Sequence, residues 1–398
     1  MAEIVKHTCF IAEPIEPEPG NAGVGIEMLE HSFELADHYM MQQHSNLCRS
    51  LLSIFVPRMQ DISERIVKKI NTLLPLISLS LAASSAFASD NTLNVYTYSS
   101  FASDWGPGPV VKKAFEKQCN GCTVNFVSLE DGVSILNRVR LEGKNSKADV
   151  LLGLDNNLMT EAKNTGLLAK SDVDTSKLTL PKGWSDDTFI PYDYGYFAFV
   201  YDSDKLKNPP ASLDALIKDQ NISVIYQDPR TSTPGQGLML WIKSVYGDKA
   251  PEMWQQLAKH TVTVTKGWSE AYNMFLKGES DMVLSYTTSP AYHIIAEDKH
   301  QYKAANFKEG HYMQVEVAAK MKNSPHPKLA DQFMQFIVSD AFQSQIATHN
   351  WMYPVTKQSL PKGFDELTVP SKALEFSADE VATHRKAWIR EWQQALTQ

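Results

Sequence analysis

The chain has 398 residues, of which 43% are hydrophobic and 21% are charged, a composition typical of globular proteins. Its formal net charge of −8 is not offset by a strongly basic stripe, which argues against nucleic acid as a partner. No apolar run of about 18 residues follows residue 88, so we expect no membrane-spanning helix after that point.

Residues 67–88 have the order of a secretory signal peptide. Two lysines are followed by an apolar run that begins at Leu73 and by an Ala-Phe-Ala cleavage site at 86–88. We therefore expect export from the cytoplasm and a mature protein that begins near residue 89. Residues 1–66 contain no motif and differ in composition from the rest. We interpret them as a non-native N-terminal extension ahead of a natural start at residue 67.

From residue 92 the pattern alternates between strands and helices. The expected elements are strands over 93–98, 123–129, 149–154, 192–201 and 314–321, helices over 110–118, 132–141, 328–346 and 378–396, and a second α/β set over 223–302. This alternation predicts a parallel α/β sheet. The aromatic run over 192–201 is expected to cross between two lobes.

Four residues contain the two cysteines of the expected mature chain, in the order Cys119-Asn120-Gly121-Cys122. No second Cys or His pair stands at metal spacing, so a zinc site is not expected. In an oxidising compartment this spacing favours a local disulfide between Cys119 and Cys122 that closes a turn. A catalytic thiol is the alternative.

Three polar loops follow predicted strands, which places each at a carboxyl edge, where open α/β folds bind ligands. In the loop over 228–237, Thr233 is expected as the N-cap and Pro234 as the first helical residue. The hydroxyls of Ser232 and Thr233 and the free backbone N–H groups would form an anion site. Ordinary helix capping is the alternative.

The other two loops offer hydroxyl and carboxyl groups. Tyr286, Thr287, Thr288 and Ser289 would hydrogen-bond a polar ligand, or form a capped turn around a core tyrosine. Glu130-Asp131-Gly132 would complement the dipole of the following helix, or would face a cationic ligand.

The sequence also contains aromatic residues that are suited to contact a ligand, and it lacks the common catalytic motifs. Tyr98, Trp268 and Trp351 lie at or near the ends of predicted elements, where flat rings pack in a core or stack on heteroaromatic and cationic ligands. The sequence contains no GxSxG, GxxxxGK[ST] or HExxH motif, so it indicates neither an enzyme nor a metal site.

From about Thr92 to its C-terminus the chain resembles the bacterial periplasmic thiamine-binding proteins, the soluble receptors of thiamine ABC importers. The matching stretches are 98–109, 129–134, 143–150, 226–235, 263–272 and 284–293. The resemblance implies an α/β, two-lobed type II periplasmic binding protein fold with a ligand cleft between the lobes. Lobe 1 would be residues 89–195, completed by about 318–398, and lobe 2 would be residues 196–317.

The resemblance also implies ligands and partners. The family binds thiamine, thiamine phosphate and thiamine diphosphate and passes them to a membrane permease. Its ligand contacts fall on Asp131, Gly132, Ser232, Thr233, Trp268, Tyr286, Thr287, Thr288 and Ser289, with Tyr98, Tyr292 and Trp351 as further cleft aromatics. It implies a monomer in the periplasm, without a cofactor, a metal or a catalytic residue.

The chemistry of these residues suits such a ligand. We expect Asp131, Gly132 and the aromatics to hold the two rings, and Ser232, Thr233 and the 286–289 turn to hold the hydroxyethyl or phosphate tail. Closure would occur about hinges near 192–196 and 314–317.

Three rivals stay open at this stage. A thiaminase-like enzyme would use Cys119 or Cys122 as a nucleophile. A ferric-iron receptor would use adjacent tyrosines, and the sequence has no Tyr-Tyr pair. A receptor for a polyamine or another small cation would leave the anion-type loop unexplained.

Overall fold

A computed structural model describes residues 91–397. The expected signal peptide at 67–88 and the expected extension at 1–66 lie outside the described residues. Within residues 91–397, none of the helices combines the length and the hydropathy that a membrane span needs.

The strands and helices follow the expected alternation. The strands are β1 (Thr92–Tyr98), β2 (Thr123–Leu129), β3 (Val150–Asp155), β4 (Leu168–Ala169), β5 (Phe189–Asp202), β6 (Val224–Gln227), β7 (Thr261–Thr265), β8 (Met282–Tyr286), β9 (Tyr302–Ala304), β10 (His311–Met321), β11 (Tyr353–Pro354) and β12 (Ala373–Leu374). The helices are α2 (Ser99–Ala102), α3 (Gly108–Gln118), α4 (Gly132–Glu142), α5 (Met159–Lys163), α6 (Leu213–Lys218), α7 (Thr233–Tyr246), α8 (Ala250–Ala258), α9 (Trp268–Leu276), α10 (Pro290–Glu297), α11 (Pro327–Ile337), α12 (Asp340–Gln345) and α13 (Ala378–Ala395). The single helix expected over 328–346 is two helices, because the chain leaves helical geometry at Ser339, which precedes α12.

The main path through the sheet is β2-β1-β3-β10-β5-β8-β6-β7. The triplets β2-β1-β3 and β8-β6-β7 are parallel, as the alternation predicted. The two central strands β5 and β10 run antiparallel to their neighbours, which the alternation did not predict. The reason is topological. β5 leaves the first triplet for the second, and β10 returns from the second to the first.

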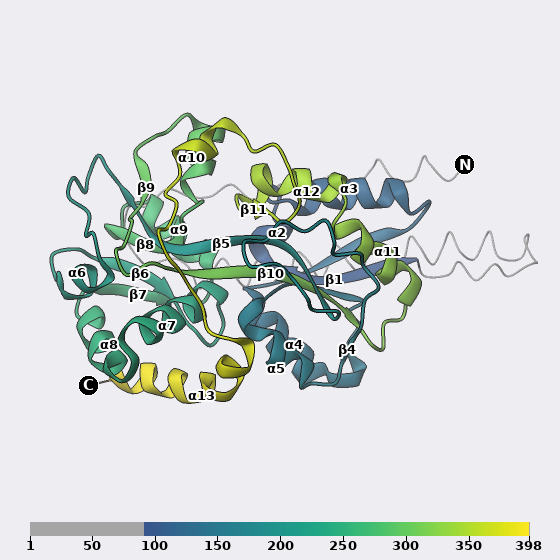
Figure 1. The fold of residues 1–398 in the computed structure, drawn as a ribbon, viewed down its shortest axis with the longest axis horizontal. Coiled ribbons are helices and arrows are strands. Elements are labelled where there is room, and N and C mark those ends of the chain that lie inside the picture. The colour runs from purple at the N-terminus through teal and green to yellow at the C-terminus, as the bar shows by residue number, and fades with distance from the viewer. Residues whose placement is uncertain (1–90, 398) are drawn as a thin grey trace, which may run out of the picture. The chain divides into compact units, whose positions relative to one another are not determined.

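Strand β5 belongs to both halves of the sheet. Residues 189–196 pair with β10, and residues 197–201 pair with β8. Figure 1 shows β5 and β10 crossing the centre of the molecule next to one another. The fold is therefore two-lobed, with lobe 1 around β2-β1-β3, lobe 2 around β8-β6-β7, and two long strands that connect them.

Alternating strand residues separate the cores on the two faces of each half-sheet. In lobe 1, Val95 points to the core under α3, α11 and α12, while Tyr96 points to the core under α4. In lobe 2, Phe199 packs with α6, α7 and α8, while its neighbour Val200 packs with α9. Helices thus cover both faces of both halves, as expected for an α/β protein.

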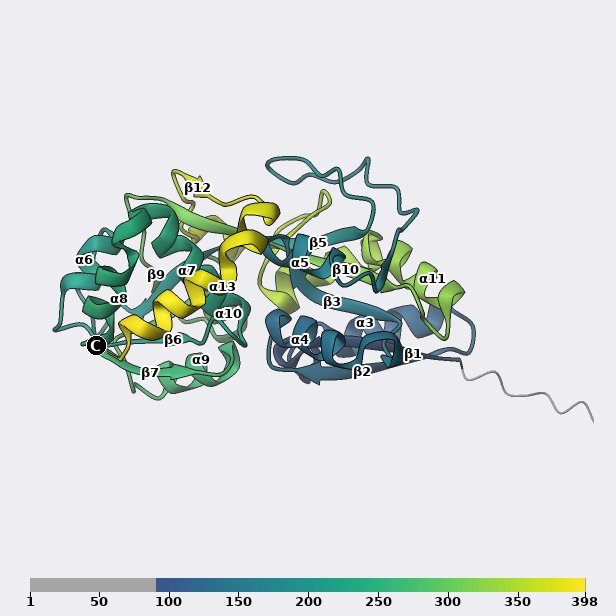
Figure 2. The same ribbon diagram turned by 90° about the horizontal axis from the view of Figure 1, so that it is seen from below.

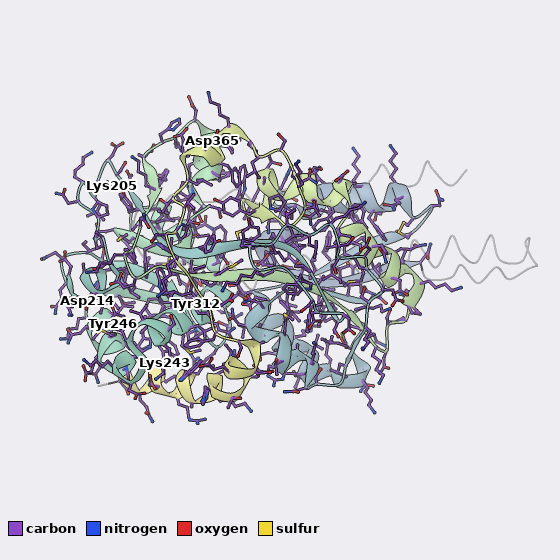
Figure 3. The ribbon with its side chains drawn as sticks, viewed as in Figure 1. Lys205, Asp214, Lys243, Tyr246, Tyr312 and Asp365 are labelled. Atoms are coloured by element: carbon purple, nitrogen blue, oxygen red, sulfur yellow. A yellow bond between two sulfur atoms is a disulfide. The ribbon has the colours of Figure 1, made fainter. Side chains whose placement is uncertain are left out.

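The C-terminal helix α13 differs from the expectation that residues 318–398 complete lobe 1. Val381, Trp388 and Trp392 pack into the core of lobe 2, because their spacing places them on one stripe of the helix. Lys243 of α7, labelled in Figure 3, lies 3.0 Å from the Glu391 carboxylate of α13. Figure 2 shows α13 running from lobe 2 towards α5 of lobe 1.

Cys119 and Cys122 lie between α3 and β2, and their sulfur atoms are joined in a disulfide. Cys119 ends α3, and Asn120 and Gly121 turn the chain with φ values of 52° and 98°. The side chain of Cys122 is buried against the lobe 1 core.

Candidate functional site

A cavity of about 440 Å³ is lined by residues of both lobes. Lobe 1 contributes Tyr98, Ser99, Ser100, Ser103, Trp105 and Asp131, from the end of β1, α2 and the loop after it, and the start of α4. Lobe 2 contributes Trp268, Ser269, Tyr272, Asn273, Leu276, Tyr286, Ser289 and Tyr292, from α9 and the region of β8 and α10. Glu316 of β10 and the segment Asn350, Trp351 and Met352 complete the lining.

Seven of the twelve residues expected from the sequence line this cavity, namely Tyr98, Asp131, Trp268, Tyr286, Ser289, Tyr292 and Trp351. The other five, Gly132, Ser232, Thr233, Thr287 and Thr288, do not line it. They are buried around it, with Ser232, Thr287 and Thr288 fully enclosed.

Asp131 connects the beginnings of three helices. It is the N-cap residue of α4, and its Oδ2 atom accepts hydrogen bonds from Ser232 Oγ at 2.6 Å and from Trp268 N at 3.2 Å. Ser232 is itself the N-cap of α7, and Trp268 is the first residue of α9. The expectation that Thr233 caps α7 is therefore wrong, because the Ser232 side chain accepts the hydrogen bond from Gly235 N.

Burial dominates the titration of the Asp131 carboxyl group. Desolvation raises its pKa from 3.8 to about 7, although the hydrogen bonds from Ser232 and Trp268 act in the opposite direction. The group therefore exchanges a proton near neutral pH, at a point where three helix N-termini present positive ends of their dipoles.

Three of the four hydroxyl groups in the turn over 286–289 form hydrogen bonds with protein groups outside the turn. Ser289 Oγ lies 2.6 Å from Ser285 Oγ and accepts a hydrogen bond from Tyr286 N at 3.1 Å. Trp268 Nε1 donates to Ser285 Oγ at 2.7 Å, so this network also fixes the Trp268 ring. Within the described chain, the buried Oγ1 atom of Thr287 has no hydrogen-bond partner.

Aromatic rings form the walls of the cavity. Trp105 of lobe 1 is 50% exposed, and its ring centroid lies 6.3 Å from that of Trp268 in lobe 2. Trp268 stacks on Tyr272 at 4.9 Å. Tyr292 and Trp351 meet edge to face at 5.4 Å. Such walls suit a flat ligand, and their faces attract a cation.

Sequence reasoning missed Glu316, which lies at the base of the cavity. Its Oε2 atom accepts hydrogen bonds from Tyr98 Oη at 2.6 Å and from Tyr192 Oη at 2.7 Å. Asp193 is its register partner on β5. Burial raises the pKa of both carboxyl groups. The signal in the sequence was a charged residue in the middle of an apolar strand.

The lining contains carboxyl groups and no Lys, Arg or His side chain. Across residues 91–397, no group of three or more His, Cys, Asp and Glu side chains is placed to hold a metal ion. Neither Cys119 nor Cys122 contributes to the cavity. The lining thus combines aromatic rings with carboxyl groups, both of which attract cations.

Comparisons with known proteins agree with this chemistry. Residues 107–344 match the family described as bacterial extracellular solute-binding protein. The chain is 65% identical over 325 residues to the thiamine-binding periplasmic protein of Escherichia coli (strain K12), which covers 81% of this chain and 98% of that relative. A solved structure of a periplasmic thiamin binding protein has 66% identity and a TM-score of 0.76, and covers 77% of this chain and 96% of that one.

A more distant structure shares the fold alone. The apo ferric ion-binding protein A of Pasteurella haemolytica has 19% identity and a TM-score of 0.63, and covers 77% of this chain and 98% of that one.

Proposed function

This chain belongs to the bacterial extracellular solute-binding proteins and, within them, to the thiamine-binding periplasmic proteins, and on that premise we propose that its cavity binds thiamine in the periplasm for an ABC importer. The chain is a binding protein and not an enzyme. The observation that carries the proposal is a cavity with aromatic walls, two buried carboxyl groups and no basic side chain in its lining.

Thiamine has two flat rings, an aminopyrimidine and a permanently cationic thiazolium. The rings fit between aromatic walls such as Trp105, Trp268 and Tyr292, and the charge suits both those faces and the nearby carboxyl groups of Asp131 and Glu316.

We place the hydroxyethyl or phosphate tail of the ligand at the Asp131 end of the cavity. The starts of α4, α7 and α9 meet there, and helix N-termini favour phosphate oxygens. Because the pKa of Asp131 is about 7, a protonated carboxyl group is accessible at neutral pH and is able to donate to a phosphate oxygen. Thiamine phosphate and thiamine diphosphate are therefore included as ligands.

The delivery step uses the two connecting strands. The pairing of β5 with β10 changes register between Glu316 and Val317, at the position expected for a hinge. Contacts between the lobes lie beside the cavity, as between Ser134 Oγ and Thr231 O at 2.8 Å. Opening would break such contacts, ligand capture would restore them, and the closed monomer would dock on the membrane permease.

Calorimetric titration of the full chain with thiamine, its two phosphate esters, Fe(III) and putrescine tests the ligand assignment. Binding of thiamine with no heat from Fe(III) or putrescine is expected. Binding of Fe(III) or putrescine without thiamine would overturn the assignment in favour of a ferric-iron or polyamine receptor.

The position of the tail is tested with Thr233→Val, which keeps the side-chain shape and removes a buried hydroxyl that has no hydrogen-bond partner in the described residues. This substitution should weaken the phosphate esters more than thiamine. Equal losses for all three ligands would contradict this placement of the tail.

A further inference from the structure

Two carboxyl groups lie side by side on the strands that connect the lobes. Asp193 of β5 and Glu316 of β10 are register partners, and we call them the carboxylate pair. Asp193 is fully buried, and Glu316 is 6% exposed and lines the cavity. Asn350 bridges the pair, since its Nδ2 atom donates to Asp193 Oδ2 at 2.6 Å and lies 3.5 Å from Glu316 Oε2.

The surroundings of the carboxylate pair contain no compensating cation. Among residues 91–397, the groups that most affect the titration of Asp193 and Glu316 include no Lys, Arg or His side chain. The polar groups that face the pair or interact with it electrostatically are Tyr98 from β1, Tyr192 from β5, Tyr286 from β8, Gln314 from β10, Asn350, and the carboxyl groups of Asp131 and Asp155. Every ionisable group in this set is neutral when it is protonated and negative when it loses its proton, so none of them supplies a positive charge.

Two buried carboxylates this close cannot both be charged without a partner of opposite sign. Asp193 Oδ1 is buried and, in the described part of the chain, accepts no hydrogen bond. It is thus free to carry a proton. Burial and the mutual repulsion of the two charges raise the pKa of Asp193 well above its ordinary value.

We infer that the carboxylate pair is the cation-selecting element of the cavity, and that it exchanges one proton for the ring cation of the ligand. The inference rests on the proposed function and deepens it. In the free protein the pair holds one proton and one negative charge. When the thiazolium enters, the O–H bond of the pair breaks, the proton goes to solvent, and the cation beside Glu316 balances the second negative charge of the pair. No other bond forms or breaks.

This exchange couples ligand charge to the hinge. The pair lies where β5 and β10 change register, so its charge state affects the strands about which the lobes move. A neutral ligand of the same shape would leave the proton on the carboxylate pair. It would therefore bind less tightly than the cationic ligand.

Titration calorimetry of the full chain at pH 7, in buffers with different ionisation enthalpies, counts the protons. The probes are thiamine and its neutral thiophene isostere, in which carbon replaces the charged ring nitrogen. Thiamine should release about one proton per ligand bound, and the isostere should release none. Equal proton counts for the two ligands would overturn the inference. Failure of both ligands to bind would instead refute the proposed function.

Substitutions assign the proton to the pair. Glu316→Gln and Asp193→Asn should each abolish most of the proton release, and Glu316→Gln should weaken thiamine at least about tenfold more than the isostere. Glu142→Gln is the matched control, because Glu142 accepts a hydrogen bond from Tyr96 Oη at 3.1 Å and lies outside the cavity lining. It should behave as the wild type. Proton release that persists in both test variants would assign the proton to Asp131 and contradict the inference.

Discussion

The Oδ2 atom of Asp131 lies 2.6 Å from the Oγ atom of Ser232, although the two residues belong to different lobes. The same carboxylate accepts a hydrogen bond from the first residue of α9, so one side chain of lobe 1 contacts two helix starts of lobe 2. A buried side chain that lines the cavity is therefore also one of the contacts that join the lobes.

Gly132 allows this close approach. A Cβ atom at this position would overlap Gly153 O and lie 2.7 Å from Thr233 Oγ1 of the opposite lobe. Gly132→Ala should therefore displace the start of α4 from its place between Gly153 and Thr233 and weaken thiamine binding by about tenfold or more, which calorimetric titration measures. Leu141→Ala, an exposed change on the same helix, is the control and should bind as the wild type does. Normal affinity in Gly132→Ala would show that closure tolerates the added methyl group.

Ser232 combines a helix cap with the contact between lobes. Ser232→Ala should lower the free energy of unfolding by about 2–3 kcal/mol, since it removes a cap and leaves Asp131 with one donor fewer. Ser377 also caps a helix, α13, by accepting a hydrogen bond from Glu380 N at 3.2 Å, but it has no such contact with a buried carboxylate. Ser377→Ala should cost about 1 kcal/mol in the same urea titration. Equal losses of unfolding free energy in the two variants would contradict a stabilising role for Ser232 between the lobes.

Arg385 joins α13 to both lobes. It donates hydrogen bonds to Gln236 Oε1 and, at 3.4 Å, to Pro229 O in lobe 2, and its Nη1 atom lies 3.5 Å from Glu161 Oε2 in lobe 1. Arg385→Met should cost about 3 kcal/mol of unfolding free energy, because buried partners lose their donor. Arg390→Met, on the exposed face of the same helix, should change it by less than about 0.5 kcal/mol. Similar values for the two variants would contradict the bridging role.

Asp155 should make stability depend on pH. Burial raises its pKa from 3.8 to about 7, so the folded protein holds a proton that the unfolded chain releases between those values. This contribution is fully present below about pH 4 and is lost as the pH rises through about 7. As the pH rises from about 4 to about 7, the unfolding free energy of the wild type, measured in urea, should therefore fall relative to that of Asp155→Asn. Parallel pH profiles for the two proteins would show that Asp155 does not titrate there.

The disulfide should matter for stability and not for binding. It closes a loop of four residues, and neither cysteine lines the cavity, so replacing Cys119 and Cys122 by Ser should cost about 2 kcal/mol of unfolding free energy. Thiamine affinity should be unchanged. Thiamine cleavage by the wild type that the double variant lacks would revive the thiaminase-like alternative.

The sequence predicted local structure well where one hydrophobic periodicity, or one residue that starts or ends a helix, marked the element. The bounds of β2 and the start of α13 agree with their patterns, because alternation and a Ser cap are local signals. The antiparallel direction of β5 and β10 was not predicted, since it depends on two strands that are far apart in the chain.

The candidate site was predicted in part for a related reason. Trp268, which lines the cavity, was predicted because it follows a strand that is visible in the sequence, and Tyr292, which also lines it, was predicted from the family resemblance. Glu316 was missed because nothing local shows that a strand passes under a cavity. Ser232 and Thr233 were read as ligand contacts, whereas in the structure Ser232 binds Asp131 from the opposite lobe, a contact between residues 101 positions apart.

The position of α13 has a consequence for the order in which the core of lobe 2 is completed during synthesis. The core of lobe 2 contains Val381, Trp388 and Trp392, which come from the last 18-residue helix of the protein. A chain on the ribosome that has not yet reached α13 lacks these side chains. The core of lobe 2 is therefore completed only after α13 is made, later than the strands and helices against which α13 packs.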